Sequence, residues 1–310
     1  MPGAYAHITA VNIASEISRL EGANVSKQLV LAAAKYLKLV ELGAVSPDYP
    51  YLDISIGSSA KAWADKMHYT DTGEMIRAGL ELLPEAPAED REKALAWLMG
   101  YAAHVVTDLT IHPVVESRVG PYAQNAKEHR ICEMHQDAHV FQRLGLGPVG
   151  IAEHLDSGIG RCSEPESDDL DSVVALLWRQ MLERVYPHEY ASNPPNPCDW
   201  HSGFKTIVDA AEEGYKLFPF ARHVAAGQGL TYPAQEKIDS SYIESLATPG
   251  NIPMHYDDIF DHAVENILVM WRDMGEALER ADAPLFAKLG AWNLDTGRDA
   301  DGQYVYWRVA

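Results

Sequence analysis

The chain has 310 residues, with 45 acidic and 25 basic side chains, a formal net charge of −20, 13 histidines and 3 cysteines. With 47% hydrophobic and 23% charged residues, its composition is that of a folded globular protein rather than a disordered one. The acidic balance argues against a broad grip on nucleic acid or on an anionic membrane, because both need clustered Lys and Arg.

The N-terminal segment predicts an amphipathic helix rather than a secretory signal. Ala10, Ile13, Ile17 and Leu20 fall on one side of a helical wheel. A signal peptide would need a basic start and an unbroken apolar core, and no later window has the uncharged length of a membrane span. The cysteines are odd in number and far apart, which fits a reducing compartment. We therefore expect a cytoplasmic protein without an integral membrane segment.

Helical periodicity dominates the rest of the chain. We expect helices over residues 8–21, 26–42, 59–68, 72–83, 89–111, 124–143, 167–185, 201–216 and 256–281. Gly43, Pro113 and Gly145 are expected to end the second, fifth and sixth of these. A polar turn at Asp299–Gly302 predicts a short C-terminal β-hairpin.

These elements predict an all-α fold, a multi-helix bundle that carries the hairpin at its end. We expect residues 1–310 to form a single domain, and a domain break near 160–167 is the alternative. Within the single domain, residues 1–145 form the metal-binding half and residues 146–310 a helical elaboration of unassigned role.

Residues 100–113 carry the strongest chemical pattern in the sequence. Gly100, His104, Asp108 and His112 recur every four residues and therefore form one stripe along a helix. Zinc binds imidazole nitrogen and carboxylate oxygen, so the stripe predicts a metal site. Gly100 lacks a side chain one turn before His104, which we expect to leave open space there.

The next helix repeats the spacing with His129 and Glu133, and Asp137 lies one turn further. Facing helices of a bundle can hold more than one metal between such side chains. Three isolated candidates add to the pattern: His7 at the start of the first helix, Asp48 in a loop, and His68 at the end of a short helix.

A second, weaker cluster lies on the helix after Pro253. His255, Asp258, His262 and Glu265 share one side of that helix. They predict either partners that orient metal-bound histidines or residues that line a pocket. The alternative is a solvated acidic face with two buried histidines.

Taken in order, the candidate ligands resemble those of the bacterial zinc-dependent phospholipase C family, which is related to the single-strand-specific fungal nucleases. The resemblance covers roughly residues 1–140 and rests on His7, Pro47–Asp48, His68, Gly100-x3-His104-x3-Asp108, His112 and His129-x3-Glu133. It implies the helical phospholipase C/nuclease fold and two or three zinc ions.

Carried over by position, the resemblance assigns ligands to three ions. Asp48, His68, His104 and Asp108 would hold the first; His112, His129 and Glu133 the second; His7 and Asp108 the third, with Asp108 bridging it to the first. Asp48 would also orient or deprotonate the attacking water.

The chain departs from the family's pattern at two points. Secreted members complete the third site with an N-terminal Trp, whereas this sequence reads Met1-Pro2-Gly3 and has no Trp before His7. The spacing from Asp108 to His112 is also shorter than in those enzymes.

The expected activity is hydrolysis of a phosphodiester or phosphomonoester by a metal-activated water. Its expected substrate is a small phosphorylated molecule or a phospholipid headgroup. Two alternatives stay open: a di-iron enzyme that activates oxygen, although such sites usually use Glu-x-x-His pairs, and a non-catalytic, metal-stabilised binding protein. The sequence makes no prediction of the oligomeric state.

Overall fold

The computed structural model of the chain describes residues 3–52, 59–147, 158–167, 169–205 and 232–307. Within these ranges the regular elements are helices and no strand occurs, which confirms the predicted all-α class. The α-helices are α1 (Ala4–Ala14), α2 (Ile17–Gly22), α3 (Lys27–Lys35), α4 (Leu37–Val45), α5 (Ala60–Tyr69), α6 (Thr72–Leu82), α7 (Ala88–Val119), α8 (Tyr122–Val140), α10 (Ser172–Val185), α11 (Pro187–Ser192), α14 (Tyr256–Glu279) and α15 (Pro284–Lys288). Short 3₁₀ turns are η1 (Ser46–Leu52), η2 (Leu83–Glu85), η3 (Phe141–Leu144), η4 (Ile159–Arg161), η5 (Gln235–Lys237) and η6 (Ser240–Tyr242).

Two of the expected helices are broken in the structure. The helix expected over 8–21 divides between α1 and α2, and the one expected over 26–42 divides at Tyr36, whose φ of −128° and ψ of 41° are not helical. The helix expected over 201–216 begins earlier, at residue 197, and its residues after 205 lie outside the described residues.

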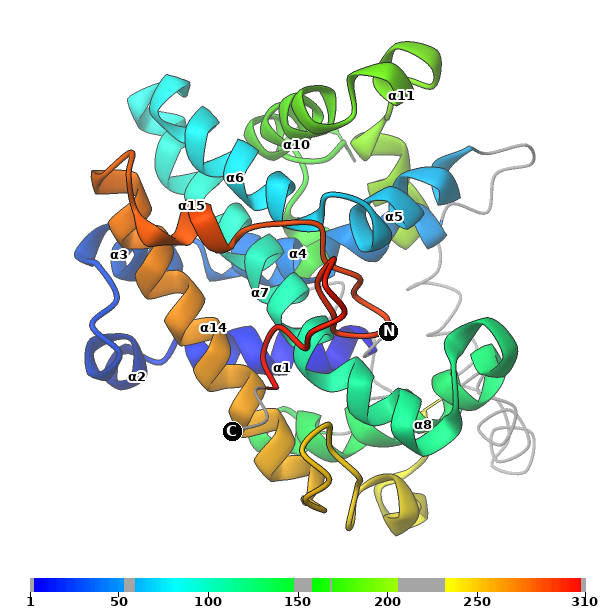
Figure 1. Ribbon diagram of the computed structural model, residues 1–310. Helices are drawn as coiled ribbons and strands as arrows, with labels where there is room; N and C mark the ends of the chain where they lie inside the picture. The colour runs from blue at the N-terminus through cyan, green and yellow to red at the C-terminus, as the bar shows by residue number, and fades with distance from the viewer. Residues whose placement is uncertain (1–2, 53–58, 148–157, 168, 206–231, 308–310) are drawn as a thin grey trace.

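Helix α7 runs through the middle of the molecule, with α1, α3, α4 and α14 packed around it (Figure 1). All of its residues from 94 to 115 are buried. Its length and apolar composition would also suit a membrane span, but its most apolar 18-residue stretch is wholly buried inside the fold. The apolar character of α7 is therefore accounted for by its place in the core.

Helices α4 and α7 touch at two glycines. A Cβ on Gly100 would lie 2.0 Å from the carbonyl oxygen of Val40, and one on Gly43 would lie 2.1 Å from that of Trp97. The prediction that Gly43 ends its helix is wrong, because α4 continues to Val45. Gly43 is needed inside the helix for this close contact. The space beside Gly100 is filled by the backbone of α4 rather than left open.

Pro113 does not end its helix either, since α7 continues to Val119. The C-terminal segment packs against α7 at this point. A Cβ on Gly297 would lie 2.3 Å from the Pro113 ring, and the Trp307 indole donates a hydrogen bond of 2.7 Å to the carbonyl of Thr110. These tertiary contacts outweigh the local cost of the proline, so His112 stays in helical register with Asp108.

The C-terminal β-hairpin expected around Asp299–Gly302 is not present. Residues 293–304 make only isolated antiparallel bridges, one between Asn293 and Arg298 and one between Arg298 and Tyr304. The Asp299 carboxylate accepts hydrogen bonds from the backbone of Asp301 and Gln303, which closes a tight turn in place of a ladder.

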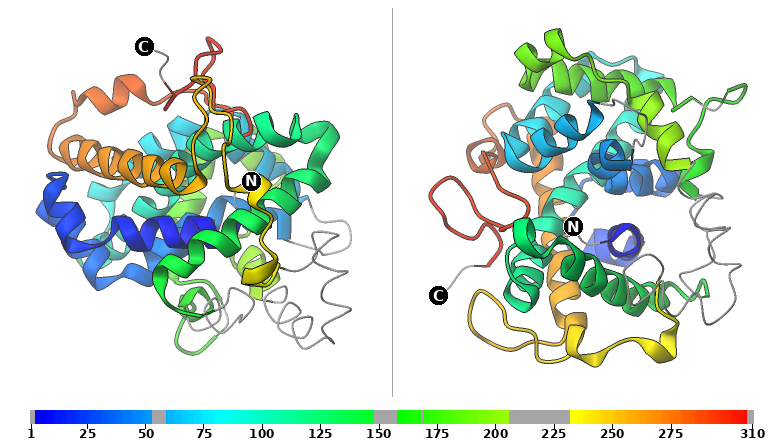
Figure 2. Two further views of the ribbon diagram at one scale, coloured as in Figure 1. Left: turned by 90° about the horizontal axis from the view of Figure 1, so that it is seen from below. Right: turned by 90° about the vertical axis from the view of Figure 1, so that its right-hand side faces the viewer.

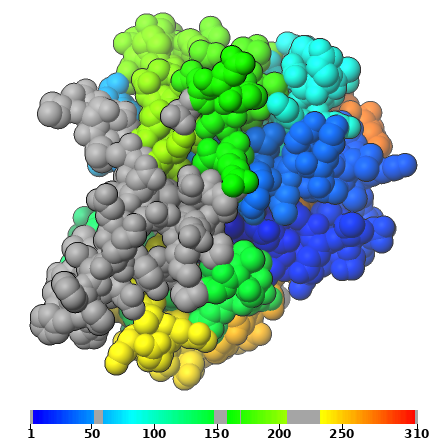
Figure 3. Space-filling model, turned by 180° about the vertical axis from the view of Figure 1, so that it is seen from behind, coloured from blue at the N-terminus to red at the C-terminus, as the bar shows by residue number. Residues whose placement is uncertain are grey.

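Helix α1 lies between α4 and α8 (Figure 2). Figure 3 shows the face opposite to that of Figure 1, where the segment 158–167 lies against the N-terminal helices. There the Cys162 thiol donates a hydrogen bond of 3.3 Å to the carbonyl of Lys38. The C-terminal half also enters the core, because Trp178 packs on Trp97 and the Trp271 indole donates to the carbonyl of Met99.

Candidate metal centre

Six of the predicted ligands converge on the middle of α7. His104, Asp108 and His112 lie on α7 itself, His7 comes from α1, Asp48 from η1 and His68 from α5. Each of the four histidines and Asp108 is at most 1% exposed, whereas the Asp48 side chain is 16% exposed. The structure therefore gathers side chains from four segments into one buried group.

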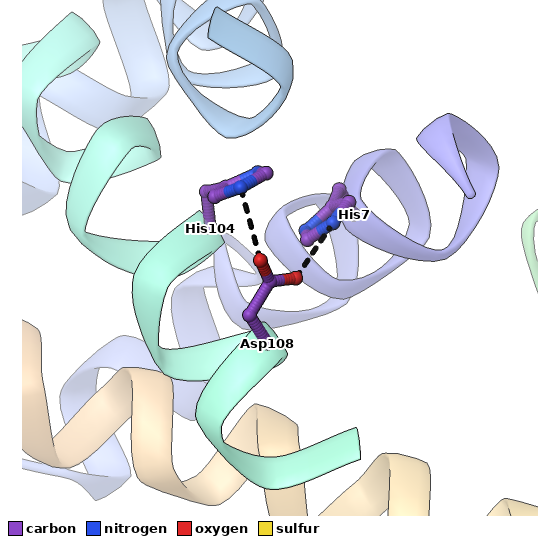
Figure 4. A group of neighbouring side chains, drawn as sticks. All are labelled: His7, His104 and Asp108. Atoms are coloured by element: carbon purple, nitrogen blue, oxygen red, sulfur yellow. Dashed lines mark ion pairs between the residues drawn. The ribbon is translucent and has the colours of Figure 1, made fainter. Parts of the chain in front are cut away.

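Asp108 is the centre of this group. Its Oδ1 lies 3.3 Å from His7 Nε2 and 3.9 Å from His112 Nε2, and its Oδ2 lies 3.2 Å from His104 Nε2 and 3.8 Å from His68 Nε2. Figure 4 shows His104, on the same helix as Asp108, and His7, on α1, pointing at the two oxygens. The carboxylate thus faces two sets of imidazoles, one with each oxygen.

Asp48 joins the second of these sets. Its Oδ1 lies 3.2 Å from His68 Nε2 and 4.0 Å from His104 Nε2, and the two histidine Nε2 atoms are 3.4 Å apart. Ligands bound tetrahedrally to zinc at about 2.0–2.1 Å are separated by about 3.3–3.4 Å. The shortest separations in the group match that spacing.

Four of the predicted histidine ligands each donate one ring N–H to a backbone carbonyl oxygen. His68 Nδ1 bonds to the carbonyl of Ala64 at 2.7 Å, His104 Nδ1 to that of Ala44 at 2.9 Å, His112 Nδ1 to that of Leu294 at 2.6 Å, and His129 Nε2 to that of Gly120 at 2.6 Å. A carbonyl oxygen only accepts, so each of these nitrogens carries the proton. In a neutral ring the other nitrogen then has a free lone pair, the arrangement in which histidine binds metals.

His129 and Glu133 form a second pair on α8, with His129 Nδ1 at 3.7 Å from Glu133 Oε1. Both side chains are buried. His112 interacts electrostatically with Glu133, so this pair lies beside the end of the α7 stripe. All eight residues that the resemblance proposed as ligands are therefore found in two adjoining groups.

The group contains a concentration of buried polar atoms that make no hydrogen bond. Among the described residues these include both ring nitrogens of His7, both oxygens of Asp108, Asp48 Oδ1, His112 Nε2 and His129 Nδ1. A buried polar atom without a partner costs about 1–3 kcal/mol. Imidazole lone pairs that face carboxylate oxygens need a cation between them, and these residues therefore fit zinc.

The charges of the group perturb the pKa values of its members. Burial alone would lower the pKa of His104, but Asp108 and Asp48 outweigh burial and raise it to about 9. Burial would raise the pKa of Asp108, but His104 and His112 hold it well below its usual range. Burial lowers the pKa of His112 to about 4. Asp108 is thus ionised at neutral pH, as a ligand must be.

A cleft of about 270 Å³ reaches this centre. Asp48 and Glu133 line it together with aromatic side chains that include Tyr51 and Tyr122, and with Arg130. Ala126, Arg130 and Glu133 recur at helical spacing on one face of α8, and Tyr122 lies before Asn125, whose φ of −130° and ψ of 30° interrupt the helix. Neither Tyr122 nor Arg130 was predicted from the sequence, although the spacing of Arg130 from Glu133 places those two on one helix face.

Asp137, predicted one turn beyond Glu133, accepts hydrogen bonds from backbone groups at the start of α1. Its two oxygens bond to the N–H groups of Tyr5 at 3.2 Å and Ala6 at 3.0 Å, and to the hydroxyl of Tyr232 at 3.1 Å. It therefore fixes the helix that carries His7 to the helix that carries His129 and Glu133.

The remaining candidates have other partners. His255 caps α14 by accepting the N–H of Asp257, and it lies against His139. His262 bonds to the carbonyl of Tyr306, and Asp258 is exposed. The contacts found for these side chains in the described residues join α14 to α8 and the C-terminal segment rather than to the central group.

Fold and site together define an all-helical protein with a buried histidine–carboxylate centre suited to divalent metal. A family model described as zinc dependent phospholipase C matches residues 6–187, more than half of the chain. The chain belongs to the zinc-dependent phospholipase C family. Comparisons with curated proteins and with solved structures gave no match.

Proposed function

We propose that the protein is a zinc-dependent phosphoesterase that hydrolyses a phosphodiester or phosphomonoester. The observation that carries the proposal is the pair Asp48 and Glu133, which belong to the two ligand groups and also line the cleft. A cleft at such a centre gives a phosphate ester access to metal-binding residues. Membership of the family supports the same reaction class.

Two ligand sets would hold the first pair of ions. Asp48, His68, His104 and Asp108 Oδ2 would bind one, and His112, His129 and Glu133 another. Asp108 Oδ1 and His7 Nε2, which are 3.3 Å apart, would contribute to a third. Bound zinc supplies a Lewis acid that polarises a phosphoryl oxygen and lowers the pKa of water to about 7.

Asp48 is the residue that we assign to the attacking water. Burial would raise its pKa, but His104 and His68 lower it, so the carboxylate is ionised at neutral pH. It is also more exposed than Asp108, and it lines the cleft. An ionised carboxylate at that position can accept a hydrogen bond from a water and orient it toward phosphorus, or take its proton.

The cleft also bears on the two alternatives. A purely structural zinc site closes its coordination with protein ligands, whereas a catalytic site keeps a position open to water or substrate. Ligands that line a cleft favour the catalytic kind. The ligand spacing is His-x3-Asp and His-x3-Glu, which differs from the Glu-x-x-His pairs usual in di-iron bundles.

Hydrolysis of an aryl phosphodiester and an aryl phosphomonoester by zinc-loaded protein tests the proposal. We expect turnover that a chelator abolishes and added zinc restores. His104→Ala should reduce it to the background rate, because His104 faces both Asp48 and Asp108. His188→Ala, which removes an exposed imidazole on α11, serves as the matched control. Turnover that survives both chelation and His104→Ala would overturn the proposal.

A further inference from the structure

A separate group of metal-ligating side chains lies where the C-terminal end of α8 meets the start of α14. His139 comes from α8, and His255 and Asp257 come from the N-terminus of α14. One potential ligand atom from each lies within 4.8 Å of the others. All three side chains are partly exposed, so an ion could reach them directly from solvent.

Two separations in this group, both to Asp257, match those of a metal site. His139 Nε2 lies 3.1 Å from Asp257 Oδ1, and His255 Nδ1 lies 3.3 Å from Asp257 Oδ2. These separations are close to the edge of about 3.3 Å expected for ligands on a tetrahedral zinc ion. His255 Nδ1 accepts the backbone N–H of Asp257, so this nitrogen is unprotonated, and an ion bound at Nδ1 would take the place of that hydrogen bond.

We propose that His139, His255 and Asp257 form a second metal site, which takes one divalent ion of the zinc class. Two imidazoles and a carboxylate suit zinc, cobalt, nickel or copper better than calcium or magnesium, which prefer all-oxygen ligands. Three protein ligands leave the fourth position to water. The site is therefore exchangeable and binds more weakly than the buried centre.

The surrounding charges favour a cation there. The N-terminus of α14 carries a partial positive charge, but Asp257 and the exposed Asp258 lie in its first turn and oppose it. Arg143, four positions after His139, is engaged with Asp261.

An ion at this position would join α8 to α14. Arg143 and Asp261 already make a parallel cross-link one turn away, so the ion would add a second. Because α8 also carries His129 and Glu133, the second site would hold in place a helix that contributes to the buried centre. The inference does not depend on the catalytic proposal.

Zinc content after equilibrium dialysis tests the second site. We expect His139→Ala to bind one zinc ion fewer per chain than the unaltered protein, and Asp257→Asn to do the same. In a His104→Ala background, zinc should still raise the melting temperature, and adding His139→Ala should make that rise smaller, because ligands of the buried centre other than His104 stay in place in both variants. This background separates the second site from the catalytic proposal, since it is measured without activity.

Arg143→Ala is the matched control, because it breaks the neighbouring cross-link and removes no ligand. It should lower the melting temperature but keep the full zinc content and the zinc-dependent rise. Equal zinc content in the unaltered protein, His139→Ala and Asp257→Asn would overturn the proposal, as would uptake that occurs only at millimolar zinc.

Discussion

Gly43 and Gly100 bring two helices into backbone contact beneath the metal centre. A Cβ on either residue would lie 2.9–3.0 Å from the Cα of the other, and closer still to the carbonyls of Trp97 and Val40. This contact also sets the position of Ala44, whose carbonyl accepts the Nδ1 proton of His104 at 2.9 Å. The absence of a Cβ at Gly43 and at Gly100 therefore determines which nitrogen of His104 faces the ligand group.

Gly100→Ala should destabilise the protein and reduce its zinc content. The added methyl would meet backbone rather than a flexible side chain, so α4 and α7 must separate, at a cost of at least about 1–3 kcal/mol. Separation also moves Ala44 away from His104. Urea unfolding and metal analysis measure the two effects.

Gly22→Ala is the control for that substitution, because no atom lies within 4 Å of a Cβ built at Gly22. Its stability should stay within about 1 kcal/mol of the unaltered protein, since alanine favours helix over glycine. If Gly100→Ala matched this control in stability and zinc content, the helix contact would not support the site.

The ligand stripe could be predicted from sequence because it depends on local geometry alone. His104, Asp108 and His112 recur with the helical period, and that period holds wherever the helix forms. The same holds for His129 and Glu133. Their order along the chain, together with His7, Asp48 and His68, was enough to indicate the family.

The features that could not be predicted depend on contacts between distant segments. Glycine and proline signals describe local preference, yet Gly43 and Pro113 are held inside helices by packing against Gly100 and Gly297. The carbonyl of Leu294, which fixes His112, comes from 182 positions further along the chain. No spacing rule in the sequence connects such a pair.

Zinc binding should release a proton from His104 at neutral pH. In the metal-free protein the pKa of His104 is about 9, so this ring is protonated at pH 7, whereas a bound ligand must be neutral. Deprotonation of His104 should therefore make zinc affinity increase with pH, up to about pH 9. Calorimetry in two buffers of different ionisation enthalpy measures the released proton.

The raised pKa of His104 can be measured without zinc. Asp108 is the main group that raises the pKa of His104, so Asp108→Asn should move the pKa back toward its ordinary value of 6.5. NMR titration of the His104 ring in metal-free protein checks this. A His104 pKa that is unchanged by Asp108→Asn would contradict the electrostatic account.

Asp137→Asn should weaken the attachment of α1 to α8. Protonated or ionised, the Asp137 carboxyl group has two oxygens that can accept the two backbone N–H groups and the Tyr232 hydroxyl, whereas an amide has one acceptor oxygen and turns its own N–H groups toward a donor. The loss should be about 1–3 kcal/mol. Because α1 carries His7, zinc content should fall as well.

The stability that is lost in the Asp137→Asn variant should also depend on pH. Burial raises the pKa of Asp137 to about 7, above its ordinary value of 3.8. A raised folded-state pKa means that the stabilisation is greatest in acid and decreases as the pH rises through 7. In metal-free protein, the stability difference between the unaltered chain and the Asp137→Asn variant should therefore be larger at pH 5 than at pH 8. A difference that grows with pH would show that the carboxylate is stabilised as the anion.

Arg130→Gln should change substrate preference more than turnover. Among the cleft-lining residues that the structure describes, Arg130 carries the one positive side chain, and the acids Asp48 and Glu133 belong to the metal-ligand groups. Arg130 should therefore strengthen the binding of an ester with a second anionic group, and it should not strengthen the binding of an ester with a cationic headgroup. A partly solvated ion pair between Arg130 and this second anionic group contributes about 1 kcal/mol. Its loss should raise KM roughly fivefold for the anionic substrate.

The comparison uses glycerophosphate-type and choline-type esters with the zinc-loaded protein, and kcat should change little for either. Equilibrium binding of the two phosphorylated products gives a readout that is independent of turnover. Lys27→Gln removes an exposed positive charge at the start of α3 and controls for net charge. Equal changes in KM for both esters would mean that Arg130 acts through the overall field of the protein, because a direct contact discriminates between headgroups and a distant charge does not.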